Sequence, residues 1–338
     1  MFYAVNSNGE VLRHKIRLIE RDFRKWNLDS LKKKLKPPYI IEFGLPSLTR
    51  YGFEQYYKVL TDFFHNEKET VDYLIYEVHN TYENFEFYEM LNRDLPIRIL
   101  SSQKFNFDTP YPMTYCDPYI WSEDVRYTSK NKHPSHLNDK IKYKFLCLNN
   151  KNKAERHAIA SHIVSNPEIH KQTRLSYRET INVNFKSQYA ELIDPKSVDF
   201  LNTNPSFGHD MSLVYKNIFC KINTETMFDE YPNFSEKTLD CFYWTKPFVM
   251  VGPYQTMKLL KELGFKTFDQ WWSEDYDNVK DNLSRLKEII KVVDYIQSKS
   301  ITELRDIHEE MKPTLLHNFK HLRKITKIYN QIYLDSRT

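Results

Sequence analysis

Residues 215–252, YKNIFCKINTETMFDEYPNFSEKTLDCFYWTKPFVMVG, carry the pattern that decides the fold. The apolar run over 215–222 predicts a strand, which ends in the polar residues 223–226. A helix is then predicted over 235–243, followed by a buried strand over 247–251 and a helix over 255–263 that stops at Gly264. Two successive strand–helix units of this kind are typical of a parallel sheet with crossover helices.

The same alternation extends through the rest of the chain. The pattern predicts strands over 39–43, 71–78, 97–100 and 143–148, helices over 53–64, 85–91 and 153–164, and an almost wholly helical segment over 276–332 that is interrupted near Lys299 and at Pro313. Residues 109–138 contain four prolines and have no clear period, which predicts a long connection or an irregular face.

The length of 338 residues fits two domains of about 150 residues each. We therefore expect an α/β protein with two Rossmann-like lobes, residues 1–138 and 139–298. Residues 299–338 are expected to form helices that pack across both lobes.

The composition limits how the chain can bind phosphate. It has only 6 glycines, and neither GxGxxG nor GxxxxGK[ST] occurs. Any phosphate site must therefore use side chains and helix N-termini. The net charge of +4 permits an anionic ligand but does not by itself predict nucleic-acid binding.

The cysteines and the apolar runs bear on the compartment. The 4 cysteines form no CxxC pair, which argues against a zinc site or a disulfide framework. No apolar stretch reaches the roughly 18 residues that cross a bilayer, and no signal-peptide core is present. We expect a soluble cytoplasmic protein with no transmembrane segment.

The most informative polar residues surround the predicted start of the helix at 235. Asn233 or Ser235 can accept the first free N–H groups of this helix. Ligands of parallel α/β sheets bind at the carboxyl ends of strands, and the N–H groups of a helix start favour a diphosphate there. Lys237 would add positive charge, and Glu236 is a residue type that accepts hydrogen bonds from a ribose diol. The competing interpretation is an ordinary capped helix in which Glu236 offsets the helix dipole and Lys237 is solvated, and spacing alone favours it.

The order Ser235-Glu236-Lys237, helix, then the strand 247–251 ending at Gly252 resembles the donor-binding C-terminal lobe of GT-B glycosyltransferases, especially the α1,3-fucosyltransferase-like group. Ser235 stands where that family usually has threonine. The strand 145–149 followed by Arg156-His157 is similar to a second block of the family, which often reads His-Arg. A third similar block, 260–268 with Arg285 downstream, extends the resemblance over about 144–285.

The resemblance implies a metal-independent transfer of sugar from a nucleoside-diphosphate sugar, with no cofactor required. Glu236 would hold the ribose, while Lys237 and Arg156 would hold the phosphates. The predicted donor-binding set is completed by three polar residues of the same segment: Asn223, Glu225 and Ser235. The acceptor is predicted to be a glycan, a small molecule or modified DNA.

The first lobe would bind the acceptor and supply a general base. Glu77 and His79 lie at the carboxyl end of the strand 71–78, and Glu42 lies inside a short apolar strand where burial would raise its pKa. Glu77 is the favoured base, against the alternative that each of these is an ordinary structural polar residue.

Two observations argue against a metal site. Asp275-Tyr276-Asp277 has the DxD form, but it precedes a predicted helix, which favours a helix cap. His157 and His162 are five residues apart, one more than the helical spacing that a metal pair prefers. Two other functions stay open: a non-catalytic binding protein on a degenerate glycosyltransferase scaffold, and a phage DNA-modifying sugar transferase.

Overall fold

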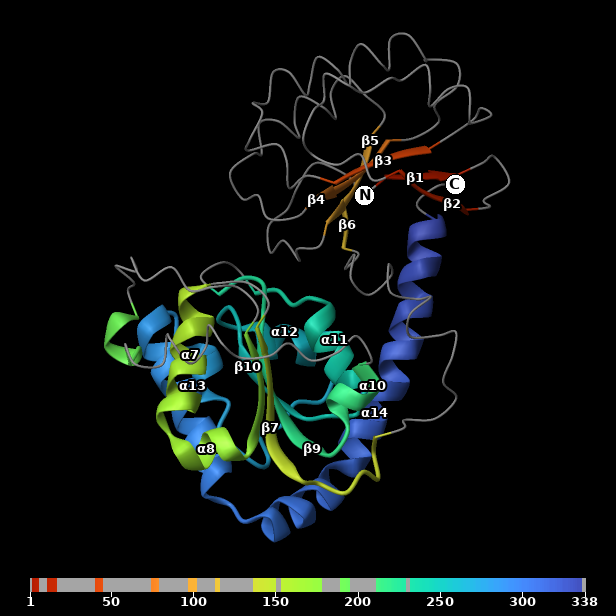
Figure 1. Cartoon of the computed structure of the whole chain (residues 1–338). Coiled ribbons are helices and arrows are strands. Elements are labelled where there is room, and N and C mark those ends of the chain that lie inside the picture. The colour runs from red at the N-terminus through yellow and green to blue at the C-terminus, as the bar shows by residue number, and fades with distance from the viewer. Residues whose placement is uncertain are drawn as a thin grey trace. The chain divides into compact units, whose positions relative to one another are not determined.

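The computed structural model describes residues 136–149, 153–177, 189–194, 211–228 and 232–335, with side chains up to Ile328, and the backbone of six strands within residues 2–115. The chain divides into two compact units, one of Met1–Ser122 with Lys327–Thr338 and one of Glu123–Thr326 (Figure 1). The predicted packing of residues 299–338 across both lobes stays a prediction.

The first unit contains a six-stranded mixed sheet. Its strands are β1 (Phe2–Val5), β2 (Val11–Ile16), β3 (Ile40–Gly44), β4 (Leu74–Val78), β5 (Ile97–Ser101) and β6 (Met113–Tyr115), in the order β2-β1-β3-β4-β5-β6. The strands from β3 to β6 pair in parallel, whereas β1 pairs antiparallel with both neighbours.

The sequence located three of these strands. The predictions over 39–43, 71–78 and 97–100 are confirmed at their centres as β3, β4 and β5. β1 and β2 were missed. β6 lies within 109–138, the segment predicted to be a long connection or an irregular face, and was also missed, because a three-residue strand is too short to show a period. The predicted helices over 53–64 and 85–91 lie outside the described residues.

The second unit is built on a four-stranded parallel sheet. Its strands are β7 (Tyr143–Asn149), β8 (Thr173–Tyr177), β9 (Ile218–Thr224) and β10 (Phe248–Val251), in the order β10-β9-β7-β8. Every residue of β9 and β10 is buried, as expected for parallel strands covered on both faces. The expected α/β class is confirmed for this unit.

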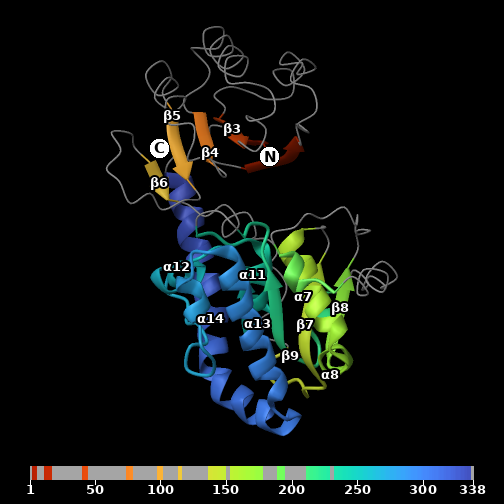
Figure 2. The same ribbon diagram turned by 90° about the vertical axis from the view of Figure 1, so that its left-hand side faces the viewer.

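Helices cover both faces of this sheet (Figures 1 and 2). They are α7 (Ala154–Ser165), α8 (Pro167–Lys171), α10 (Met211–Tyr215), α11 (Glu236–Tyr243), α12 (Thr256–Glu262), α13 (Asn282–Ser298) and α14 (Ile301–Asp335), with short 3-10 turns at Ala190–Leu192 and Asp275–Asn278. α7 connects β7 to β8, and α11 connects β9 to β10, in the opposite direction along the sheet. Because crossovers between parallel strands are right-handed, the two helices lie on opposite faces of the sheet.

Most predicted boundaries hold, with two corrections. Gly264 has φ 89° just after α12, as expected for a glycine that ends a helix. The strand predicted over 215–222 starts too early, since Tyr215 ends α10 and Asn217 has φ 64°. Asparagine tolerates this left-handed conformation, which turns the chain before β9 begins.

The second correction concerns Pro313. The predicted break at Lys299 is confirmed, and Ser300 and Glu303 form a reciprocal capping box at the start of α14. The predicted interruption at Pro313 is wrong, because α14 continues through it. Residues on both sides of the proline, such as Leu304 and Leu322, are buried, and this burial offsets the hydrogen bond that proline cannot make.

Buried basic groups lie at the amino end of the second sheet. Lys246 is 1% exposed, and its ammonium donates to the carbonyls of His136 (3.2 Å) and Ile218 (3.1 Å). His308 is 3% exposed, and its Nε2 has no hydrogen-bond partner among the described residues. Burial, followed by the charge of Lys246, lowers the pKa of His308 from 6.5 to about 4.

We therefore expect His308 to make the protein acid-sensitive. In the unfolded chain His308 gains its proton near its ordinary pKa of 6.5, whereas in the folded protein it does so only near pH 4. The stability of the fold is therefore complete above pH 6.5 and falls as the pH drops from 6.5 towards 4. The loss should be up to about 3 kcal/mol. Urea unfolding at pH 7 and pH 4 should show a smaller pH-dependent loss for His308→Gln than for the wild type. Equal losses in the two proteins would contradict this assignment.

Candidate anion-binding site

The direction in which the chain adds strands to the second sheet reverses between β7 and β9. The chain passes from β7 to β8 on one side and later returns to add β9 and β10 on the other. At the carboxyl ends of the two central strands, the Thr224 hydroxyl donates to the Asn149 side-chain oxygen at 2.8 Å. Such a switch point is where open α/β sheets bind their ligands.

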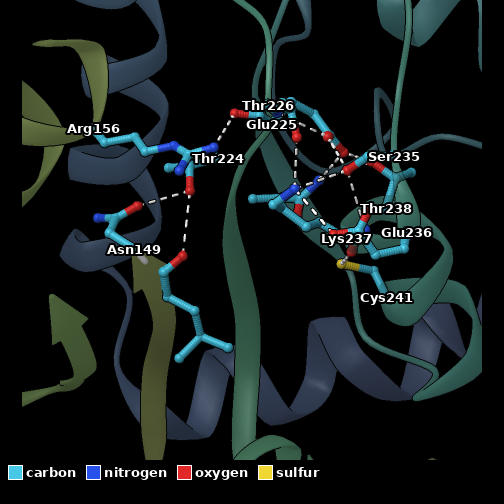
Figure 3. Close-up of polar contacts among 12 residues, drawn as sticks. Asn149, Arg156, Thr224, Glu225, Thr226, Ser235, Glu236, Lys237, Thr238 and Cys241 are labelled. Carbon is cyan, nitrogen blue, oxygen red and sulfur yellow. Dashed lines mark hydrogen bonds and ion pairs between the residues drawn. The ribbon is translucent and has the colours of Figure 1, made fainter. Parts of the chain in front are cut away.

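All six residues predicted to bind the donor lie at this end of the sheet, and all of them except Asn223 are labelled in Figure 3. They come from the first turn of α7, the end of β9, the residue that follows it and the start of α11: Arg156, Asn223, Glu225, Ser235, Glu236 and Lys237. Four of them are buried, since Asn223, Glu225, Ser235 and Arg156 are at most 3% exposed. The side chains of Lys237 and Glu236 are 25% and 35% exposed.

Glu225 is the centre of this cluster. One carboxylate oxygen accepts hydrogen bonds from Thr238 Oγ1 (2.5 Å) and Asn223 Nδ2 (3.2 Å). The other accepts from Ser235 Oγ (2.5 Å) and the Thr226 backbone N–H (3.3 Å). The carboxylate thus ties the end of β9 to the first turn of α11.

These contacts keep Glu225 ionised although it is buried. Burial alone would raise the pKa of its carboxyl group, but the charge of Lys237 and the hydrogen bonds from Ser235 and Thr238 outweigh this effect. The resulting pKa lies below the ordinary value. A fixed negative charge therefore lies beside the N-terminus of α11.

Lys237 faces the same cluster from the half-exposed side. Its Nζ donates to Thr226 Oγ1 at 2.8 Å, to Ser235 Oγ at 3.1 Å and to Glu236 Oε1 at 3.2 Å. Its backbone N–H donates to Ser235 Oγ at 3.4 Å, so of the two predicted capping residues, Asn233 and Ser235, it is Ser235 that caps this helix.

Arg156 reaches the cluster from α7. Its Nη2 donates to the Glu225 carbonyl at 2.6 Å, while its Nε is buried with no hydrogen-bond partner in the described part of the chain. Lys153, the N-cap residue of α7, donates through Nζ to the Thr226 carbonyl. The side chain of Lys153 makes no capping hydrogen bond to the α7 start, and the dipole of this helix adds positive potential there.

Arg285 stabilises the turn at residues 225–228, which receives these contacts. This side chain is 1% exposed and donates to the carbonyls of Phe228 (2.5 Å), just after the turn, and Gly252 (3.2 Å), just after β10. Its guanidinium also lies over the Phe228 ring at 4.3 Å. Arg285 had appeared in the sequence only as part of a similar block, and its anchoring role was not predicted.

The DxD sequence is a capping element. Asp277 accepts the backbone N–H groups of Met257 (2.9 Å) and Lys258 (3.0 Å), so it caps α12 rather than the helix that follows it. Asp275 bonds to Ser273, two residues away. Among the described residues, no group of three or more His, Cys, Asp or Glu could hold a metal ion.

The predicted base lies in the first unit. The backbone of Glu77 is in β4, opposite Gly44 of β3 and Leu100 of β5. Its side chain lies outside the described residues, as do that of Glu42 and the whole of His79.

Comparison of the sequence with models of known protein families gave no match, and comparison with curated proteins gave none. In the part of the chain that the structure describes, no helix is long and apolar enough to cross a membrane.

Proposed function

We propose that the chain is a metal-independent GT-B glycosyltransferase that binds the diphosphate of a nucleoside-diphosphate sugar at the carboxyl ends of β7 and β9. In this proposal Arg156 and Lys237 hold the diphosphate, and Glu236 holds the ribose. The first unit binds the acceptor, with Glu77 as the general base that takes the acceptor proton.

The observation that carries the proposal is the convergence of positive charge on one turn. Lys153, Arg156 and Lys237 all donate to backbone or side-chain oxygens of residues 225 and 226. They come from two helices whose N-termini flank the switch point, and both helix dipoles add positive potential. A ligand with several adjacent negative oxygens suits this arrangement better than a neutral or cationic one.

The half-exposed residues fit the outer part of such a ligand. Lys237 and Glu236 retain solvent exposure, whereas Glu225, Asn223 and Ser235 are buried. A phosphate next to Lys237 would leave Glu236 within reach of a neighbouring sugar hydroxyl.

A second candidate function is a binding protein that holds a sugar nucleotide without transferring the sugar. It is favoured by the burial of four of the six predicted residues, which leaves few polar side chains to act on a bound molecule. Transfer to a DNA acceptor is a third possibility, and a steep salt dependence of DNA binding would support it.

A thermal-shift screen tests the function. The protein is heated with UDP-, GDP-, dTDP- and CMP-sugars, each well above its expected dissociation constant, and a bound ligand should raise stability by about 2–4 kcal/mol. Release of free nucleotide from the sugar that binds would favour the transferase over the binding protein. The absence of any shift would contradict both.

A further inference from the structure

The N-terminus of α11 already holds an anion that belongs to the protein. The Glu225 carboxylate accepts from Ser235 and Thr238, the N-cap and the third residue of this helix. The carboxylate thus places a negative charge beside the helix start, where the helix dipole also favours a phosphate.

Lys237 is engaged by the same cluster. An ammonium group has three N–H donors, and Lys237 directs one to each of Thr226, Ser235 and Glu236. Ser235 in turn donates to Glu225, so one hydroxyl links the ammonium to the buried carboxylate. A phosphate can bind Lys237 fully only when at least one of these bonds opens.

We propose that Glu225 is an internal anion that competes with the ligand for Lys237 and thereby lowers the affinity of the site for phosphate. This inference rests on the proposed function, because it assigns a regulatory part of the same anion site. Lys237 is held by Thr226, Ser235, Glu236 and, through Ser235, by the charge of Glu225 when the site is free, and turns towards the phosphate when the site is occupied.

The cluster can allow this exchange without coming apart. Glu225 keeps four hydrogen bonds that do not involve Lys237, from Thr238, Asn223, Ser235 and Thr226. These bonds stabilise the carboxylate charge when the ammonium moves away. The alternative is that Glu225 positions Lys237 for the ligand, and it makes the opposite prediction.

The test is the substitution Glu225→Gln, which removes the charge and keeps the size of the side chain. Titration with inorganic pyrophosphate should show binding about tenfold tighter than in the wild type, because the repulsion of a nearby negative charge is gone. Glu274→Gln is the matched control, since Glu274 is also a buried carboxylate paired with a lysine, Lys261 at 3.3 Å. The control should leave pyrophosphate affinity unchanged.

A second variant guards against misfolding of the first. Thr226→Val removes an exposed acceptor of Lys237 without removing a charge, and it should tighten pyrophosphate binding about twofold to threefold. If either folded variant binds pyrophosphate as the wild type does, or more weakly, the competition is contradicted and Glu225 is a positioning residue.

A measurement without ligand separates this inference from the proposed function. Lys237 should react with an amine-selective reagent several-fold faster in Glu225→Gln and in Thr226→Val than in the wild type, as followed by mass spectrometry of its peptide. If no protein binds pyrophosphate but Lys237 is labelled faster, the function fails and the restraint on Lys237 stands. An unchanged labelling rate in both variants overturns the restraint itself.

Discussion

Replacing Arg285 by methionine should lower the free energy of unfolding by about 3–5 kcal/mol. The guanidinium is buried and donates to four backbone carbonyls, those of Phe228, Gly252, Val279 and Lys280, and to Asn282 Oδ1. Methionine fills much of the space but leaves these buried acceptors without their donors, and an unsatisfied buried carbonyl is costly.

Urea unfolding of Arg285→Met measures the effect, and Arg305→Met is the matched control. Arg305 also lies on a helix and donates to a backbone carbonyl, that of Ile141 at 3.2 Å, but it is exposed. The control should lose less than about 1 kcal/mol. A loss of that size for Arg285→Met would show that the anchor behind the turn is dispensable.

The second large effect is expected for Lys237→Ala. A hydrogen bond from an ammonium to a phosphate contributes about 1.5–3 kcal/mol, so pyrophosphate affinity should fall by roughly tenfold to a hundredfold. The fold should persist, because Glu225 keeps its hydrogen bonds from Ser235 and Thr238.

Calorimetric titration of the folded variant gives the affinity, and Lys261→Ala is its control. Lys261 lies on α12 and is also a partly exposed lysine in an ion pair, with Asp269 at 2.8 Å. This variant changes the net charge equally and should bind pyrophosphate as the wild type does. Equal affinity in Lys237→Ala would remove Lys237 from the site.

Local signals account for what the sequence predicted correctly. The start of α11 was predicted because a serine stands directly before the helical pattern, and its end and the following strand were predicted from apolar spacing. Gly264 marked the end of α12, because a glycine in the left-handed conformation commonly follows the last turn of a helix. These features depend on a few neighbouring residues, so one sequence is enough to reveal them.

Contacts between distant residues explain what could not be predicted. Asp277 caps a helix that begins about twenty residues before it, and Arg285 holds a carbonyl 57 positions away. Donor binding by Glu225 stays a prediction, but the contacts of its side chain with Ser235 and Thr238 were not predicted. The spacing of residues gives no sign of such pairings, which follow from how the strands and helices meet.

We expect a diphosphate to bind where β7 and β9 end. A crystal structure of the protein grown with UDP or GDP, whichever gives a thermal shift, tests this claim most directly. We expect the diphosphate within hydrogen-bond distance of Lys237, close to the first turn of α7 and the turn after Glu225. A diphosphate bound elsewhere on the protein, with Lys237 still bonded to Thr226 and Ser235, would contradict the claim.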